Sequence, residues 1–231
     1  MELISLSALD YLFVLPFIFL AGLIDSIAGG GGLISLPAYV AAGLPMHTAL
    51  ATNKFSSACG TAFSTANYLH SKVIDLPVAL LSALLALIGA YLGTRTVQNL
   101  SPEPLRYLLI FVIPVIAILT FIRKDFGSKN RSSEMKLGVR LFLGAFAGLI
   151  IGFWDGFFGP GTGTFLILIY TMLMHYDFMV ANGNTKVVNL TSNITALITF
   201  LIAGKVYFPL AIPSAICGVA GNILGSKLVI H

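Results

Sequence analysis

The sequence predicts an all-α, polytopic helical membrane protein built from two inverted structural repeats. Three observations predict this class: the composition, the length of the apolar runs, and an internal repeat. Of the 231 residues, 57% are hydrophobic and only 10% are charged, whereas a soluble domain carries about 25% charged residues. The apolar run 76–92 contains no charge at all, and roughly 20 mostly apolar residues are enough to cross the hydrocarbon core of a bilayer. We therefore expect several membrane-spanning helices surrounded by lipid.

Nine apolar segments follow one another along the chain. The second and seventh hold only about a dozen residues, which as helices are too short to cross a bilayer. We expect these two to be half-helices or re-entrant arms that begin at glycine-rich turns. The nine expected segments are 8–27, 33–44, 48–69, 76–97, 105–122, 137–153, 164–174, 185–203 and 208–230.

An internal repeat sets the domain organisation. Three motifs recur in the same order, each 130 to 132 residues later. Gly22-x-x-Asp25 recurs as Gly152-x-x-Asp155, the three glycines 29–31 as Gly159-Pro-Gly161, and Asn53-Lys54 as Thr185-Lys186. The repeat predicts a first transmembrane unit over 1–122, a basic cytoplasmic loop over 123–136 and a second transmembrane unit over 137–231. The fifth segment has no counterpart in the second unit. We therefore expect that unit to lack its last helix, or a neighbouring subunit of a homo-oligomer to cover that face.

The distribution of positive charge predicts the orientation. Six of the thirteen Lys and Arg residues lie between Arg123 and Arg140, and the positive-inside rule places such a loop in the cytoplasm. A unit with an odd number of segments then puts its two copies in opposite orientations. Inverted repeats with short, glycine-interrupted segments at matching positions indicate the binding site of a secondary transporter. Basic residues gathered in one loop do not indicate a nucleic-acid partner.

Two glycine-rich turns form the first candidate binding element. Each precedes a short segment, and hydrocarbon offers the backbone of such a turn no hydrogen-bond partner. Glycine lets the backbone approach a ligand and point successive N–H groups into one concavity, which with the start of the next helix favours an oxyanion. The alternative is close helix packing through small residues. The substrate-binding residues expected here are Gly29, Gly30, Gly31, Gly32, Gly159, Gly161, Thr162 and Gly163.

Polar residues on the third and eighth segments form the second candidate element. They recur every three or four positions, so they share a helix face, which inside a membrane must meet protein or water. Lys54 and Lys186 are the best candidates for contacting an anion. The alternatives are helix–helix hydrogen bonds, worth about 0.6 kcal/mol each, and lysines that snorkel to the membrane surface. The binding residues expected here are Asn53, Lys54, Ser57, Thr185, Lys186, Asn189 and Asn193.

Asp25 and Asp155 lie near the ends of the first and sixth segments. A carboxylate inside a membrane is costly unless it is paired or protonated. Two roles are open for each: proton coupling, or acceptance of amide hydrogen bonds from the glycine turn that follows. The four histidines show no metal-ligand spacing, and the chain has no G-x-x-x-x-G-K-[ST] phosphate loop. We therefore expect no metal and no cofactor.

These motifs resemble those of the TauE/SafE-type sulfite exporters, also called toluene sulfonate uptake permeases. The resemblance rests on Gly22-x-x-Asp25, the glycines 29–32, Pro37 and the run 51–54, with a looser copy in the second half. It covers almost the whole chain. It implies a permease for small sulfur oxyanions or organosulfonates in a bacterial or archaeal plasma membrane.

The function expected from the sequence is secondary transport of a small anion, sulfite or an organosulfonate. A cation or neutral-solute carrier that uses Asp25 and Asp155 as ligands is the first alternative. An intramembrane enzyme is the second, although the sequence offers neither a nucleophile–base pair nor a metal cluster for it.

Overall fold

The protein is a bundle of α-helices, described by a computed structural model over residues 6–121 and 127–230, and no β-strand occurs in these two ranges. The predicted all-α class is confirmed. A 3₁₀ turn (Ser132–Glu134) lies before α6, and a π-helical turn (Ile169–Leu173) extends α7. The α-helices are α1 (Ala8–Ala28), α2 (Gly32–Ala41), α3 (Met46–His70), α4 (Leu76–Gln98), α5 (Pro102–Phe121), α6 (Leu137–Phe157), α7 (Thr162–Leu168), α8 (Phe178–Ile202) and α9 (Phe208–Ile230).

The outer surface of the bundle is that of a multi-pass membrane protein. Within the described ranges, α1, α4, α6, α8 and α9 are long and apolar enough to cross a membrane. Large apolar side chains such as Leu9, Phe111 and Ile202 point outward. A soluble protein rarely exposes this much apolar surface, whereas lipid solvates it. The expected multi-pass membrane localisation is thereby confirmed.

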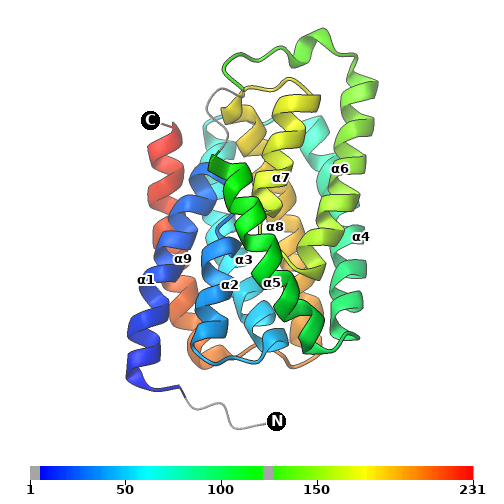
Figure 1. The fold of residues 1–231 in the computed structure, drawn as a ribbon. Coiled ribbons are helices and arrows are strands. Elements are labelled where there is room, and N and C mark those ends of the chain that lie inside the picture. Colours follow the sequence, from blue (N-terminus) through cyan, green and yellow to red (C-terminus); the bar gives the residue numbers. More distant parts are fainter. Residues whose placement is uncertain (1–5, 122–126, 231) are drawn as a thin grey trace.

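Helices α3 and α8 lie in the middle of the bundle, with α1 and α9 on one side and α4 and α6 on the other (Figure 1). The short α2 and α7 pack on α3 and α8 respectively. In the predicted repeat α1 corresponds to α6, and α9 corresponds to α4. The packing of α1 against α9 is therefore the counterpart of the packing of α6 against α4. In Figure 1, α1 begins at the lower end of the bundle, whereas α6 begins at the upper end. This arrangement fits an inverted repeat; superposition of the two units after inversion stays a prediction.

Glycines allow the two flanking helix pairs to approach backbone to backbone. A Cβ atom on Gly89 of α4 would lie 2.2 Å from the carbonyl oxygen of Leu149 on α6, and one on Gly221 of α9 would lie 2.1 Å from that of Phe19 on α1. Close helix packing through small residues is common in membranes, where the hydrophobic effect does not draw helices together. Gly89 and Gly221 are 132 residues apart, so both units use the same packing device.

The start of α8 differs most from its prediction. The helix begins at Phe178, seven residues before the expected start at Thr185. The side chain of Asp177 caps it by accepting a hydrogen bond from the amide of Val180 at 2.9 Å. The polar run 182–186 indicates a loop from sequence alone, but here it is helical because its side chains are buried inside the protein. Lys186 is therefore more than two turns inside the helix.

Part of the predicted basic loop lies outside the described residues, namely 123–126. The rest of that loop is tied to the start of α8. The amide of Phe178 donates to the carbonyl of Gly127, and the amide of Arg131 donates to the carbonyl of His175, each at 2.9 Å. The loop therefore lies at the end of the bundle where α6 and α8 begin.

Candidate functional site

The two glycine turns contact each other inside the bundle. A Cβ atom on Gly29 would lie 2.5 Å from the carbonyl carbon of Gly163, and one on Gly32 would lie 3.1 Å from the Cα of Pro160. Gly29 has φ +70° and Gly161 has φ +84°, a backbone region that residues with a side chain rarely adopt. Glycine is therefore required both by the turn conformation and by the close approach.

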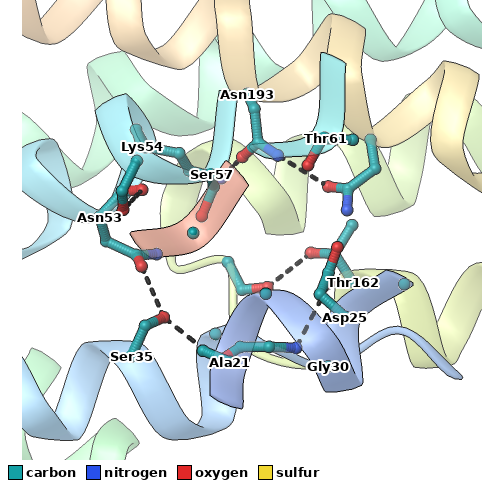
Figure 2. Close-up of a pocket in the computed structure, with 18 of the residues that line it drawn as sticks. Ala21, Asp25, Gly30, Ser35, Asn53, Lys54, Ser57, Thr61, Thr162 and Asn193 are labelled. Carbon is teal, nitrogen blue, oxygen red and sulfur yellow. Dashed lines mark hydrogen bonds between the residues drawn. The ribbon is translucent and has the colours of Figure 1, made fainter. Parts of the chain in front are cut away.

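A small cavity of about 40 Å³ lies between these turns and helices α3, α8 and α9. A cavity of that volume is large enough to admit water. Figure 2 shows Lys54, Ser57, Thr61 and Asn193 on one side of it, with Asp25 and Thr162 on the other. The predicted residues that line the cavity are Asp25, Gly30, Gly31, Gly32, Asn53, Lys54, Ser57, Asp155, Gly159, Gly161, Thr162, Gly163, Asn189 and Asn193.

Three predicted residues do not line the cavity: Gly29, Thr185 and Lys186. Gly29 is used in the contact between the turns. Thr185 and Lys186 are fully buried elsewhere on α8.

Several lining residues were not among those predicted. They are Ile18, Ala21, Gly22, Ser35, Ser56, Thr61, Gly218 and Asn222. Ser35 donates to the side-chain oxygen of Asn53 at 2.6 Å, and its place in the apolar run after the glycines gave no signal of this. Asn222 carries a buried Oδ1 atom for which no hydrogen-bond partner exists among the described residues. The repeat could not identify it, because the equivalent position, 132 residues earlier, is Ala90.

Lys54 is held inside the protein by partners from the second unit. Its ammonium lies 2.8 Å from Oδ2 of Asp155, and both side chains are only 3% exposed. It also donates to Oδ1 of Asn193 at 2.9 Å, and Asn193 in turn donates to Oδ1 of Asn189 at 3.1 Å. A buried ammonium needs such partners, because removing it from water is costly.

Lys186 makes the reverse pair. Its ammonium lies 3.0 Å from Oδ2 of Asp25 and also donates to the backbone carbonyl of Asp25. Each unit thus supplies the lysine for the other unit's aspartate. The structure shows neither lysine snorkelling to a surface, since Lys54 is 2% and Lys186 0% exposed.

Each aspartate also accepts a hydrogen bond from its own glycine turn. The amide of Gly31 donates to Oδ1 of Asp25 at 3.3 Å, and the hydroxyl of Thr162 donates to Oδ1 of Asp155 at 2.8 Å. Asp25 thus accepts an amide hydrogen bond, as in the second of the two roles considered, whereas Asp155 accepts from a hydroxyl instead of an amide. Proton coupling stays a prediction for both. In both turns the protein's own carboxylate therefore occupies a position suited to an oxyanion.

A separate polar cluster lies at the end of the bundle near the 127–136 loop. Arg140 donates to Oδ2 of Asp75 at 2.7 Å, and the hydroxyl of Tyr176 donates to the same oxygen at 2.6 Å. Burial raises the pKa of Tyr176 above its usual value, which keeps the phenol protonated and able to donate. These residues do not line the cavity, and their contacts tie α4 to α6.

The comparisons with known proteins agree with one another. The model of the family "Sulfite exporter TauE/SafE" matches residues 14–231. The chain is 35% identical over 211 residues to "Probable membrane transporter protein YfcA" of Escherichia coli (strain K12), an alignment that covers 91% of this chain and 77% of that protein. It is 30% identical over 226 residues to a "Probable membrane transporter protein" of Haemophilus influenzae, covering 98% and 87%. No solved structure matches the chain.

Proposed function

Since the chain belongs to the sulfite exporter TauE/SafE family and is a membrane transporter, we propose that it moves a small anion, sulfite or an organosulfonate, by secondary transport. The names of the relatives describe transporters without stating a solute, and the family description names sulfite. The observation that carries the proposal is the Lys54 ammonium, which lines a small polar cavity inside a membrane bundle.

The groups around Lys54 suit an oxyanion. Asn189 and Asn193 bring side-chain amides to the cavity wall, and Ser57 brings a hydroxyl. Amide and hydroxyl hydrogens can donate to several oxygens of one solute, and hydrogen bonds to a charged group are stronger than neutral ones. The cavity volume favours a small solute, or requires the cavity to widen for a larger one.

The two alternatives use the cavity differently. A cation carrier would employ Asp25 and Asp155 as ligands, yet each carboxylate already accepts from a lysine ammonium and from its own glycine turn. A cation would have to displace those partners. A neutral-solute carrier would leave the buried Lys54 without a role in binding. The enzyme alternative receives no support from the relatives, which are named as transporters.

The position of the cavity suits alternating access. The cavity lies where the two predicted units meet, and the ion pairs of Lys54 and Lys186 cross between those units. Movement of one unit against the other would alter both pairs together and would open the cavity toward one side at a time. Inverted-repeat transporters place their sites at this kind of interface.

Flux measurements test the proposal. The purified chain is inserted into liposomes, and uptake of labelled sulfite, methanesulfonate, Na⁺ and glycerol is compared with uptake into protein-free liposomes. We expect saturable uptake of one or both anions that unlabelled anion inhibits. Saturable Na⁺ or glycerol flux in the absence of any anion flux would support the corresponding alternative and overturn the proposal.

A further inference from the structure

We propose that Asp155 releases Lys54 to the solute by taking up a proton, so that one proton moves with each monovalent anion. This inference rests on the proposed function. It assigns different tasks to two ion pairs that the sequence repeat makes equivalent.

The charges at the cavity set the condition for anion binding. With Lys54, Lys186, Asp25 and Asp155 all ionised, the formal charges of the two pairs sum to zero. An added anion would leave one uncompensated negative charge in a buried site, where charges interact strongly because little water screens them. Neutralising one carboxylate with a proton restores the balance. The anion then takes the place of that carboxylate beside the lysine.

The geometry identifies the Lys54–Asp155 pair as the one that exchanges. Lys54 lines the cavity and can meet a solute there, whereas Lys186 does not line it. Lys186 is also bound to the backbone carbonyl of Asp25, a bond that no protonation removes. The pair of Lys186 and Asp25 thus fixes the end of α1 to α8.

The Asp155 carboxylate has one oxygen that depends on Lys54 alone and can take the proton when Lys54 leaves. Its Oδ1 accepts from Thr162, while its Oδ2 faces the Lys54 ammonium and has no further hydrogen-bond partner among the described residues. When Lys54 turns to the anion, a proton on Oδ2 replaces the ammonium that compensated the carboxylate. The Thr162 hydrogen bond to Oδ1 is kept in both states.

The surroundings of Asp155 contain few other groups that could supply or take the proton. From α3 it faces Lys54, and from α7 the hydroxyl of Thr162. Asn193 of α8 contacts the same ammonium. On α4, the hydroxyl of Thr94 donates to the carbonyl of Gly156, the residue that follows Asp155 on α6. Asp25 of α1 is the other carboxylate on the cavity wall, and Lys186 neutralises it.

The exchange gives a complete transport cycle. On the side where the cavity is open, a proton from water binds Oδ2 of Asp155 and the anion binds the Lys54 ammonium. Both leave on the opposite side, after which Lys54 and Asp155 pair again and the empty carrier returns. One positive and one negative charge cross together, so no net charge moves. A pH gradient should therefore drive accumulation of a monovalent anion, and a membrane potential should not.

Methanesulfonate is the appropriate probe, because its charge does not change over the pH range of the assay and any pH effect belongs to the protein. In proteoliposomes acidic on the outside by one pH unit, we expect about tenfold accumulation, since one pH unit equals a tenfold proton gradient. A potential set with potassium and valinomycin should leave accumulation unchanged. Asp155→Asn mimics the protonated aspartate, so it should exchange labelled for unlabelled methanesulfonate but should not accumulate it in response to the pH gradient.

Asp10→Asn, a matched change in the first turn of α1 and away from the cavity lining, is the control and should behave like the wild type. Two measurements on the wild-type protein keep the inference testable if Asp155→Asn fails to fold. Wild-type protein in weakly buffered detergent solution should take up one proton for each methanesulfonate bound, as reported by a pH indicator. The Kd should rise about tenfold per pH unit wherever the free protein keeps Asp155 ionised.

The outcomes separate the two proposals. Absence of any binding or uptake of methanesulfonate and sulfite by wild-type protein would overturn the proposed function. Uptake that ignores the pH gradient, binding without proton uptake, or pH-driven accumulation by Asp155→Asn would overturn the coupling inference and leave the proposed function standing.

Discussion

The Lys54 ammonium lies 2.8 Å from the Asp155 carboxylate, although the two residues belong to different units of the predicted repeat. Lys186 and Asp25 form the reverse pair at 3.0 Å. These two ion pairs join the two units. The two ion pairs are equivalent in sequence but differ in the structure: Lys54 and Asp155 are both buried and both line the cavity, whereas Asp25 is 16% exposed and Lys186 does not line the cavity.

The first prediction concerns the pair of Lys186 and Asp25, of which only Asp25 lines the cavity. Lys186→Met removes the ammonium that compensates Asp25. Breaking a fully buried ion pair costs about 3–5 kcal/mol, and the cost here should be lower because the Asp25 side chain is partly exposed. Lys186 does not line the cavity, but the Asp25 carboxylate that it compensates does. We therefore expect Lys186→Met to have a lower unfolding temperature and a weaker affinity for methanesulfonate. The double variant Lys186→Met/Asp25→Asn leaves no unpaired charge and should bind within about threefold of the wild type. Thermal unfolding and equilibrium binding on the same purified samples check this, and a large loss of affinity in a fully folded double variant would contradict it.

The second prediction tests the energetic coupling of Lys54 and Asp155. Lys54→Met and Asp155→Asn should each destabilise the protein, because each leaves the other charge buried and unpaired. The double variant Lys54→Met/Asp155→Asn leaves no unpaired charge, so its loss of stability should be smaller than the sum by at least about 1 kcal/mol. Denaturant unfolding in detergent gives the four values of the cycle. As a control, the losses of stability from Lys54→Met and Asp10→Asn should add in the combined variant. If the losses from Lys54→Met and Asp155→Asn also add, the coupling is refuted.

The third prediction tests the contact between the glycine turns. A Cβ on Gly163 would lie 2.7 Å from the Cα of Gly29, so Gly163→Ala should push the turns apart, cost about 1–3 kcal/mol and lower transport. Gly138→Ala is the matched control, since a Cβ there meets nothing within 4 Å. We expect that control to be neutral or slightly stabilising, as alanine favours the helix by about 0.5–1 kcal/mol. Equal behaviour of the two variants in unfolding and uptake would show that the turns do not need this contact.

The fourth prediction tests the sign of the solute charge. Asn189→Asp keeps the oxygen that accepts from Asn193 and adds a negative charge to the cavity wall. A like charge at about 6 Å costs about 3 kcal/mol at an effective dielectric of about 20, so the affinity for methanesulfonate should fall roughly a hundredfold. Asn99→Asp places the same charge at the exposed C-cap of α4 and should change little. A gain in Na⁺ binding by Asn189→Asp without loss of anion binding would favour the cation carrier.

Much of the fold could be predicted because membrane helices are recognisable in a sequence by their length and apolar composition. The apolar runs gave α1, α4, α6 and α9 nearly at their observed ends. The paired glycine motifs located both turns, because few residues other than glycine tolerate the backbone conformations they need. Burial that depends on a distant partner could not be predicted: the polar start of α8 reads as a loop until the rest of the bundle covers it.

The sequence predicted which residues take part in the candidate site better than it predicted which of them contact one another. The sequence places Lys54 and Lys186 in equivalent positions and predicts the same role for both. Their difference arises from which side chains reach the cavity, and this depends on the packing of helices far apart along the chain. Asn222 shows the same limit, since a single asparagine in an apolar helix, with Ala90 at the equivalent position, carries no local signal.

The affinity of purified, correctly folded Lys54→Met for methanesulfonate tests the anion site most directly. Wild-type protein and Lys54→Arg serve as comparisons, with circular dichroism and thermal unfolding to show that each variant is folded. If the ammonium holds the solute, Lys54→Met should bind at least about a hundredfold more weakly than the wild type, because an interaction of a buried charge worth about 3–5 kcal/mol is lost. Lys54→Arg should keep part of the affinity, since it keeps the charge. Wild-type affinity in a folded Lys54→Met protein would contradict the anion site described for this cavity.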